Sequence, residues 1–317
     1  MNDDSCRLCG GATRQTITRL ILKRHRVKYF TCLDCGSQQT ELPTWLGEAY
    51  SLPGLHIDVG APTRTVKNWI ATTILLERIN LPTDAKCLDF GAGSGLYTGL
   101  MRSSGRDFLS YDALQSAHFS SDYVVESLSA IKPEVITAFE VFEHLPKPGA
   151  TLAELFSQGA KLIIFTTWFI DEQDDDWVYY IPDSGQHVFF FKEAAIAKYA
   201  ATFGYEMVGS QYFYILYSPH LMSQAAREAI QHFARHSKVV LSGQIQSVIE
   251  SVIDGNQHLD RDFVQANHRL AHRLENTRLS RTVRFGFSHH MMCAISRFWK
   301  RVYLVPVRSL RKLWRSR

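Results

Sequence analysis

The sequence predicts an α/β protein in which a doubly wound, mostly parallel sheet lies between a small N-terminal cysteine module and a helical C-terminal extension. Three observations support this: cysteine pairs near the N-terminus, alternating strand-like and helix-like segments over residues 70–217, and no strand patterning over residues 219–280. Hydrophobic residues make up 45% and charged residues 21% of the 317 residues, which is the composition of a globular chain.

We expect four parts along the chain. Residues 1–45 form the cysteine module, 46–218 the α/β domain, 219–280 a helical extension, and 281–317 a basic, aromatic tail. No apolar run reaches the roughly 18 residues that a transmembrane helix needs. The N-terminus lacks the basic start and apolar stretch of a secretory signal, so the expected location is the cytoplasm.

The cysteine module contains four of the six cysteines, in two Cys-x-x-Cys turns that are each followed by glycine. Two such turns present four thiolates, which is the ligand set of a closed tetrahedral zinc site. A module of about 40 residues cannot bury an adequate core, so metal binding would supply folding free energy. A redox pair is the alternative, but it needs only one Cys-x-x-Cys. The prediction is a zinc ribbon whose structural Zn²⁺ is bound by Cys6, Cys9, Cys32 and Cys35.

A glycine-rich turn follows the first apolar strand of the α/β region. Residues 86–95 read Lys-Cys-Leu-Asp-Phe-Gly-Ala-Gly-Ser-Gly, and a helix is expected to begin near Leu96. Such a turn lets the backbone approach a nucleotide or S-adenosylmethionine closely. The glycines lack the Gly-x-Gly-x-x-Gly spacing of a dinucleotide site. The next strand, 106–112, ends in Asp112, where a carboxylate can accept both ribose hydroxyls.

These residues resemble the first motif of class I S-adenosylmethionine-dependent methyltransferases, apolar-apolar-Asp-x-Gly-x-Gly-x-Gly. Residues 135–148, Val-Ile-Thr-Ala-Phe-Glu-Val-Phe-Glu-His-Leu-Pro-Lys-Pro, look like the motif Glu-x-x-Glu-His-apolar-x-x-Pro of the branch that includes the ubiquinone O-methyltransferases. The resemblance implies a Rossmann-like domain that binds S-adenosylmethionine. It implies cofactor contacts by Asp89, Gly91, Ala92, Gly93, Gly95, Asp112, Ser127, Leu128 and Glu140.

An aromatic segment with one histidine, residues 177–191, follows the fifth predicted strand. Its end, His-Val-Phe-Phe-Phe, resembles a segment of methyltransferases of sugar and polysaccharide biosynthesis, some of which begin with a four-cysteine zinc module. The nucleotide-sugar C-methyltransferases have Glu-His where this chain has Gln186-His187, so O- and C-methylation both stay open. The expected acceptor is a sugar-containing small molecule or glycan precursor, such as a nucleotide-linked sugar. Three aromatic residues could stack on a sugar face or belong to the core: Trp168, Tyr179 and Tyr180.

Methyl transfer to a hydroxyl or a carbon acid requires a base that removes a proton. His187 is the first candidate and His144 the second, with Glu143 beside it. Alternatively, His187 is a packed histidine that bonds a main-chain carbonyl. The alternative for Glu143 and His144 is that they cap the helix starting near Lys147.

A second functional class is RNA or DNA methylation, because zinc ribbons and basic tails occur in nucleic-acid enzymes. Against it, the chain lacks the Asn/Asp-Pro-Pro-aromatic motif of base amino-methylation, and neither spare cysteine is placed as a nucleophile for pyrimidine C5. Eleven of the 35 lysines and arginines follow Glu275, the last acidic residue, so residues 1–275 carry 24 basic against 31 acidic side chains. A third class is a non-catalytic zinc-ribbon binding module, which the intact glycine loop opposes.

The C-terminal tail, residues 281–317, interleaves aromatic and basic residues. Interfacial membrane segments have this pattern, so we expect peripheral contact with the inner membrane surface. Two alternatives stay open: a helix that packs its aromatic side on the domain, and a nucleic-acid-binding arm.

Overall fold

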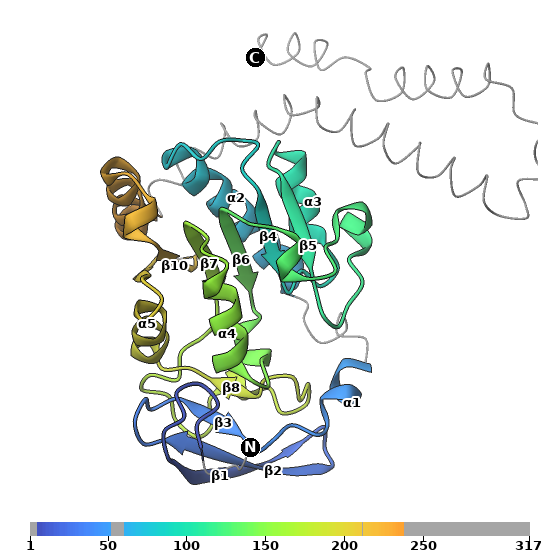
Figure 1. Ribbon diagram of the computed structural model, residues 1–317. Coiled ribbons are helices and arrows are strands. Elements are labelled where there is room, and N and C mark those ends of the chain that lie inside the picture. Colours follow the sequence, from blue (N-terminus) through green and yellow to red (C-terminus); the bar gives the residue numbers. More distant parts are fainter. Residues whose placement is uncertain (1–4, 52–59, 211, 238–317) are drawn as a thin grey trace, which may run out of the picture. The chain divides into compact units, whose positions relative to one another are not determined.

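The computed structural model describes residues 5–51, 60–210 and 212–237, which all belong to the first of two compact units, Met1–Leu259 (Figure 1). The basic tail and the predicted helical extension beyond residue 237 lie outside the described residues. Within the described part, every helix is too short or too polar to cross a membrane.

A six-stranded sheet in the order β5-β4-β6-β7-β10-β9 forms the larger domain and confirms the predicted fold class. The first four strands pair in parallel, whereas β10 pairs antiparallel with both β7 and β9. The central strands are buried on both faces, which is why they read as continuous apolar runs. The bounds are β4 Cys87–Phe90, β5 Phe108–Tyr111, β6 Val135–Phe139, β7 Leu162–Thr166, β9 Glu206–Gly209 and β10 Tyr214–Tyr217.

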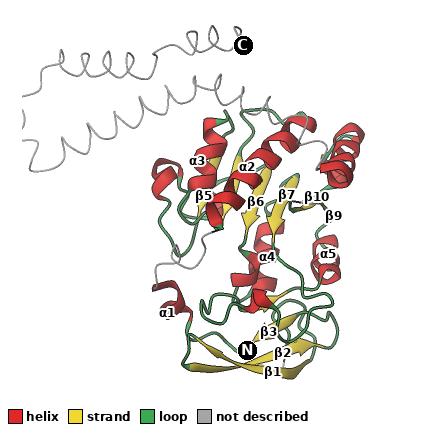
Figure 2. Ribbon diagram, turned by 180° about the vertical axis from the view of Figure 1, so that it is seen from behind, coloured by secondary structure: helices red, strands yellow, loops and turns green. Residues whose placement is uncertain are grey.

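Helices cover both faces of this sheet (Figure 2). On one face, Ile74 of α2 (Ala61–Arg78) and Met101 of α3 (Leu96–Ser103) share a core cluster with Ile230, in the helical residues 224–237. On the other face, Leu155 of α4 (Pro148–Ser157) and Ile196 of α5 (Glu193–Ala201) share a second cluster. The two-sided covering is what a doubly wound sheet requires. Short 3-10 turns are His118–Tyr123, Leu128–Ala130, Phe142–His144, Val178–Tyr180 and Pro219–Leu221.

The N-terminal cysteine module forms a second, antiparallel sheet in the order β1-β2-β3-β8. Three strands come from the module: β1 Thr13–Ile21, β2 His25–Cys32 and β3 Gln38–Thr40. The fourth, β8 Phe189–Phe190, comes from the segment that follows β7, and α1 Leu46–Ser51 follows β3. We call β1, β2 and β3 with their cysteine turns the ribbon. Its sheet is therefore completed by the larger domain.

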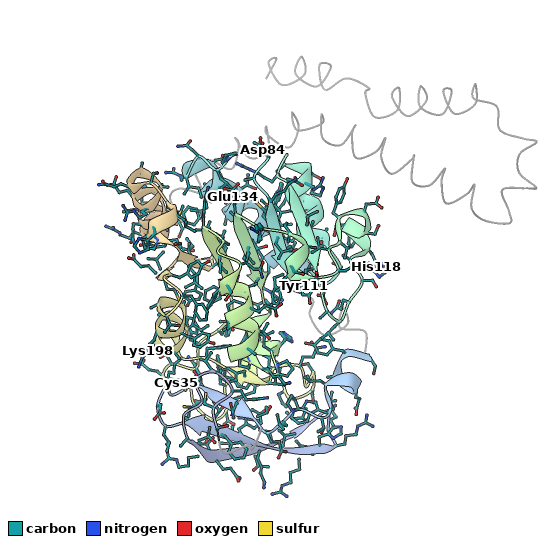
Figure 3. The ribbon with its side chains drawn as sticks, viewed as in Figure 1. Cys35, Asp84, Tyr111, His118, Glu134 and Lys198 are labelled. Atoms are coloured by element: carbon teal, nitrogen blue, oxygen red, sulfur yellow. The ribbon has the colours of Figure 1, made fainter. Side chains whose placement is uncertain are left out.

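The ribbon packs against the segments that follow the carboxyl ends of β6 and β7. The amide of Gly149, in the first turn of α4, donates to the carbonyl of Arg7 at 3.0 Å. A side chain at Gly149 would meet the Leu8 carbonyl at 2.7 Å, so only glycine allows this approach. In Figure 3, Glu134, which precedes β6, and Cys35 of the ribbon lie at opposite ends of the view. The ribbon thus lies at the edge of the sheet where ligands bind in doubly wound folds.

Candidate active site

The glycine loop connects β4 to α3 at the carboxyl edge of the sheet. Gly91, Gly93 and Gly95 have φ angles of 72°, 53° and 76°, in the left-handed region that glycine tolerates. The amides of Gly91 and Ala92 donate to the carbonyl of Tyr111, at 2.8 and 3.1 Å. These bonds fasten the loop to the end of β5.

The two acids predicted to serve the cofactor flank this loop. Asp89 is 3% exposed, and its carboxylate oxygens accept hydrogen bonds from the hydroxyls of Thr98 and Thr137, at 2.9 and 3.0 Å. Burial raises the pKa of Asp89 to about 7. Asp112 follows β5 and accepts a hydrogen bond from the Gly93 amide at 2.8 Å. Asp89 therefore lies in the protein beneath the loop, and Asp112 lies beside it.

Three further residues were predicted to contact the cofactor. Glu140 follows β6 with a φ of 54°, which is strained for a side chain of its size, and its amide donates to the Thr166 hydroxyl at 2.9 Å. Ser127 is exposed, whereas Leu128 is 3% exposed and packs in the core. Strain is often found at functional sites, so the geometry of Glu140 agrees with a place at the pocket. The cofactor contacts themselves stay predictions.

The structure brings together the three residues predicted to be catalytic. Glu143, His144 and His187 each offer a ligand atom, and these atoms lie within 4.8 Å of one another. The rings of His144 and His187 meet edge to face, 4.9 Å apart. Glu143 is fully buried and accepts a hydrogen bond from the Tyr179 hydroxyl at 2.7 Å. Two imidazoles and a carboxylate at this spacing can transfer a proton or hold a metal ion.

Hydrogen bonds fix both imidazole rings. Nδ1 of His187 lies 2.6 Å from the carbonyl oxygen of Tyr179. Since a carbonyl only accepts, Nδ1 carries the proton and Nε2 of the neutral ring has the lone pair. The bond to a main-chain carbonyl that we considered as an alternative is present, and it leaves Nε2 as the basic atom. Helix capping is not observed: α4 has Lys147 at its N-cap and no side-chain cap, so Glu143 and His144 do not cap it.

Burial sets the charge states of this cluster. It raises the pKa of Glu143 to about 8, and the negative charge of Glu140 adds to the shift. It lowers the pKa of His144 well below the usual range, with a smaller contribution from His187. Among the described residues, Oε2 of Glu143 has no hydrogen-bond partner. A buried carboxyl group that titrates near neutral pH, beside a neutral imidazole, suits acid-base chemistry.

Sequence analysis did not identify Tyr50 as part of this cluster. Tyr50 belongs to α1, which follows the ribbon, and its hydroxyl lies 2.9 Å from Nδ1 of His144. The two residues are 94 positions apart, and no local pattern marks either Tyr50 or the pairing. The hydroxyl holds the orientation of the His144 ring, so Tyr50 is a positioning residue.

We expect Tyr50→Phe to lower kcat about tenfold and to move the pH dependence of turnover, because the orientation and proton affinity of His144 change. The matched control is Tyr199→Phe, which also removes a hydroxyl hydrogen bond, in this case to the Gly149 carbonyl at 2.8 Å. Steady-state rates across pH measure both effects. The same profile in Tyr50→Phe and wild type would contradict the positioning role.

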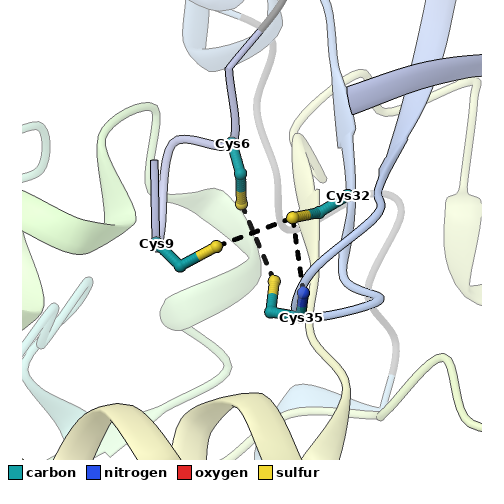
Figure 4. A group of neighbouring side chains, drawn as sticks. All are labelled: Cys6, Cys9, Cys32 and Cys35. Atoms are coloured by element: carbon teal, nitrogen blue, oxygen red, sulfur yellow. Dashed lines mark hydrogen bonds between the residues drawn. The ribbon is translucent and has the colours of Figure 1, made fainter. Parts of the chain in front are cut away.

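The four ribbon cysteines converge as Figure 4 shows. The sulfur atoms of Cys6 and Cys35 lie 3.8 Å apart, those of Cys9 and Cys32 lie 3.6 Å apart, and all four lie within 4.8 Å of one another. Four thiolates at 2.3 Å from a tetrahedral Zn²⁺ would have sulfurs about 3.8 Å apart. The cysteine cluster is therefore compatible with zinc in both ligand type and spacing.

Comparison with known proteins identifies the larger domain. Residues 66–210 match a family model described as a methyltransferase domain. The chain carries an S-adenosylmethionine-dependent methyltransferase domain. The matched range contains the glycine loop, Asp112 and the Glu143, His144 and His187 cluster. No curated protein matches the chain in sequence.

Several solved structures resemble part of the chain. One is a magnesium protoporphyrin IX methyltransferase from Synechocystis with bound S-adenosylhomocysteine, at 14% identity, covering 55% of this chain and 93% of that one, with a TM-score of 0.38. A 1,6-didemethyltoxoflavin N1-methyltransferase from Burkholderia thailandensis has 16% identity, coverages of 58% and 95%, and a TM-score of 0.39. Human N-acetylserotonin methyltransferase has 11% identity, coverages of 55% and 59%, and a TM-score of 0.40. Similarity of this degree assigns no substrate to the methyltransferase domain.

The loop of the methyltransferase domain gives a sharp test of cofactor binding. A Cβ at Gly91 would lie 2.6 Å from Cγ2 of Val141, in a backbone conformation that L residues rarely adopt. We expect Gly91→Ala to lower the free energy of unfolding by about 2–4 kcal/mol and to weaken S-adenosylhomocysteine binding at least about tenfold. Urea unfolding and isothermal titration measure the two effects.

The control is Gly159→Ala, because Gly159 has a φ of 70° but nothing within 4 Å of an added Cβ. It carries the backbone cost alone and should bind S-adenosylhomocysteine like the wild type. Equal affinities in Gly91→Ala and Gly159→Ala would show that the loop does not approach the cofactor.

Proposed function

We propose that this protein methylates a hydroxyl group or a carbon acid on a sugar-containing small molecule or glycan precursor. The observation that carries the proposal is the buried cluster of Glu143, His144 and His187 beside the carboxyl edge of the sheet. A methyltransferase acting on an already nucleophilic amine needs no such base, whereas a sugar hydroxyl must lose a proton. The resemblance of residues 187–191 to sugar-pathway enzymes supports the sugar class.

The cofactor side of the proposed site consists of the glycine loop, Asp112 and Glu140. S-adenosylmethionine supplies an electrophilic methyl group on a sulfonium. Backbone groups of the loop would lie against the methionine end, the Asp112 carboxylate would accept the ribose hydroxyls, and Ser127 and Leu128 would flank the adenine. Asp89 would act from beneath, by holding the loop through Thr98 and Thr137.

The acceptor side removes the proton in the proposed reaction. Nε2 of His187 accepts the acceptor's proton as the new bond to the methyl carbon forms and the carbon–sulfur bond breaks, releasing S-adenosylhomocysteine. The positive charge of the sulfonium is lost and an imidazolium appears, so the net charge of the site is conserved. The carboxylate of Glu143 stabilises that imidazolium.

The ribbon's proposed role is to hold the acceptor side in place. A structural Zn²⁺ bound by the four cysteines fixes the end of β2 and the turn into β3. β3 in turn pairs with β8, which begins two residues after His187. Arg7 adds a hydrogen bond to the Val188 carbonyl at 2.7 Å.

Transfer of a labelled methyl group tests the proposal. The protein is incubated with labelled S-adenosylmethionine and fractionated cell extract, and each fraction is counted before and after nuclease treatment. We expect label in nuclease-resistant nucleotide-sugar, glycan or lipid-linked material. Label that nuclease removes would overturn the proposal in favour of nucleic-acid methylation.

A further inference from the structure

A solvent-exposed tryptophan lies two residues beyond the carboxyl end of β7. Trp168 is 55% exposed, and it follows Thr166, whose hydroxyl accepts the amide hydrogen of Glu140. Trp168 and Glu140 therefore leave adjacent strands at the same edge of the sheet. A large apolar ring that stays exposed at the ligand-binding edge of such a fold needs a reason, since burial would stabilise it.

The ring of Trp168 is connected to the catalytic cluster through Tyr179. The two rings are nearly parallel, with an interplanar angle of 10° and centroids 5.2 Å apart. Tyr179 is 5% exposed, donates a hydrogen bond to Glu143, and its ring lies 4.4 Å from the His187 ring. One face of Trp168 is therefore covered by Tyr179, and its exposure comes from the other face and the edges.

Sequence analysis offered three aromatic residues for stacking on a sugar. Tyr179 and Tyr180 are 5% and 2% exposed, and the hydroxyl of Tyr180 donates to Gln38 of the ribbon. Both therefore belong to the core and cannot offer a ring face to a ligand. Trp168 can.

We propose that Trp168 is the platform on which the ring of the acceptor stacks during methyl transfer. This assignment rests on the proposed function and specifies its acceptor: a pyranose or similar ring with an apolar face and at least one hydroxyl. The electron-rich indole face attracts the C–H groups on one side of such a ring. Stacking on Trp168 holds the ring one aromatic layer from the Glu143 and His187 cluster.

The test compares Trp168→Ala, Trp168→Phe and a control, Val178→Ala, which alters another exposed side chain (76%) on the neighbouring turn. The acceptor is the nuclease-resistant extract fraction that the wild-type protein labels. We expect Trp168→Ala to need about tenfold more of this fraction for half-maximal rate, with kcat within about twofold of wild type. Trp168→Phe should recover to within about threefold, and Val178→Ala should match the wild type. S-adenosylhomocysteine affinity should be unchanged in all three.

Three outcomes overturn the assignment. An unchanged half-saturation in Trp168→Ala would exclude the platform and leave the methyltransferase function intact. A fall in kcat alone would mean that Trp168 only supports Tyr179. A wild-type protein that neither binds S-adenosylhomocysteine nor labels any fraction would remove the proposed function, and the platform with it.

Discussion

Replacing His187 with alanine should lower turnover by about 10²- to 10⁴-fold, while the affinity for S-adenosylhomocysteine stays within about twofold of wild type. The base is lost, but the glycine loop and Asp112 are untouched. Steady-state rates and isothermal titration on the same preparation separate the two effects. Loss of both together would mean that His187 holds the fold.

A second variant separates a catalytic from a packing role. In His187→Asn, the side-chain amide can still donate a hydrogen bond to the Tyr179 carbonyl, as Nδ1 does, but it cannot take up a proton. If His187 is the base, His187→Asn is stable and as inactive as His187→Ala. If His187 only packs, His187→Asn retains most of the activity. His220→Ala, at an exposed histidine, controls for histidine loss as such.

Removing zinc from the ribbon should be the largest stability change in the molecule. Cys6, Leu8 and Cys32 lie in the same core cluster as Leu152 and Leu155 of α4, so the ribbon is part of the domain's core. We expect Cys32→Ser or chelation to lower the free energy of unfolding by at least about 4 kcal/mol and to abolish turnover, because β3 no longer supports β8 and His187.

Elemental analysis should find one zinc per chain in the wild type, and restored zinc should restore turnover after chelation. The control is Cys87→Ala, which removes a buried thiol of β4 outside the cluster and should keep one zinc per chain. A wild-type protein that is fully stable without metal would contradict the zinc ribbon.

The sequence contains the local features of this molecule. Strands β4, β6 and β7 are predicted by apolar runs, the loop by Gly91, Gly93 and Gly95, and the cysteine cluster by spacing. Each of these signals lies within a few consecutive residues or within one repeated motif. The two β-strands at the end of the domain were also expected, because a turn near Ser210 separates two apolar segments.

Long-range pairings were beyond the reach of sequence reasoning. The strand pair of β3 and β8 joins Gln38 to Phe190 across about 150 residues, and two phenylalanines alone do not indicate an antiparallel partner. The contact of Tyr50 with His144 likewise depends on how the ribbon packs. Exposure was the third missing quantity: Trp168, Tyr179 and Tyr180 look equivalent in sequence, and only their burial distinguishes a platform from core.

Tandem mass spectrometry of the labelled product tests the central claim most directly, because fragmentation locates the added methyl group. The proposed function predicts that the methyl group resides on a carbon or an oxygen of a sugar ring. A methyl group on a nucleobase or on an amino-acid side chain would contradict it.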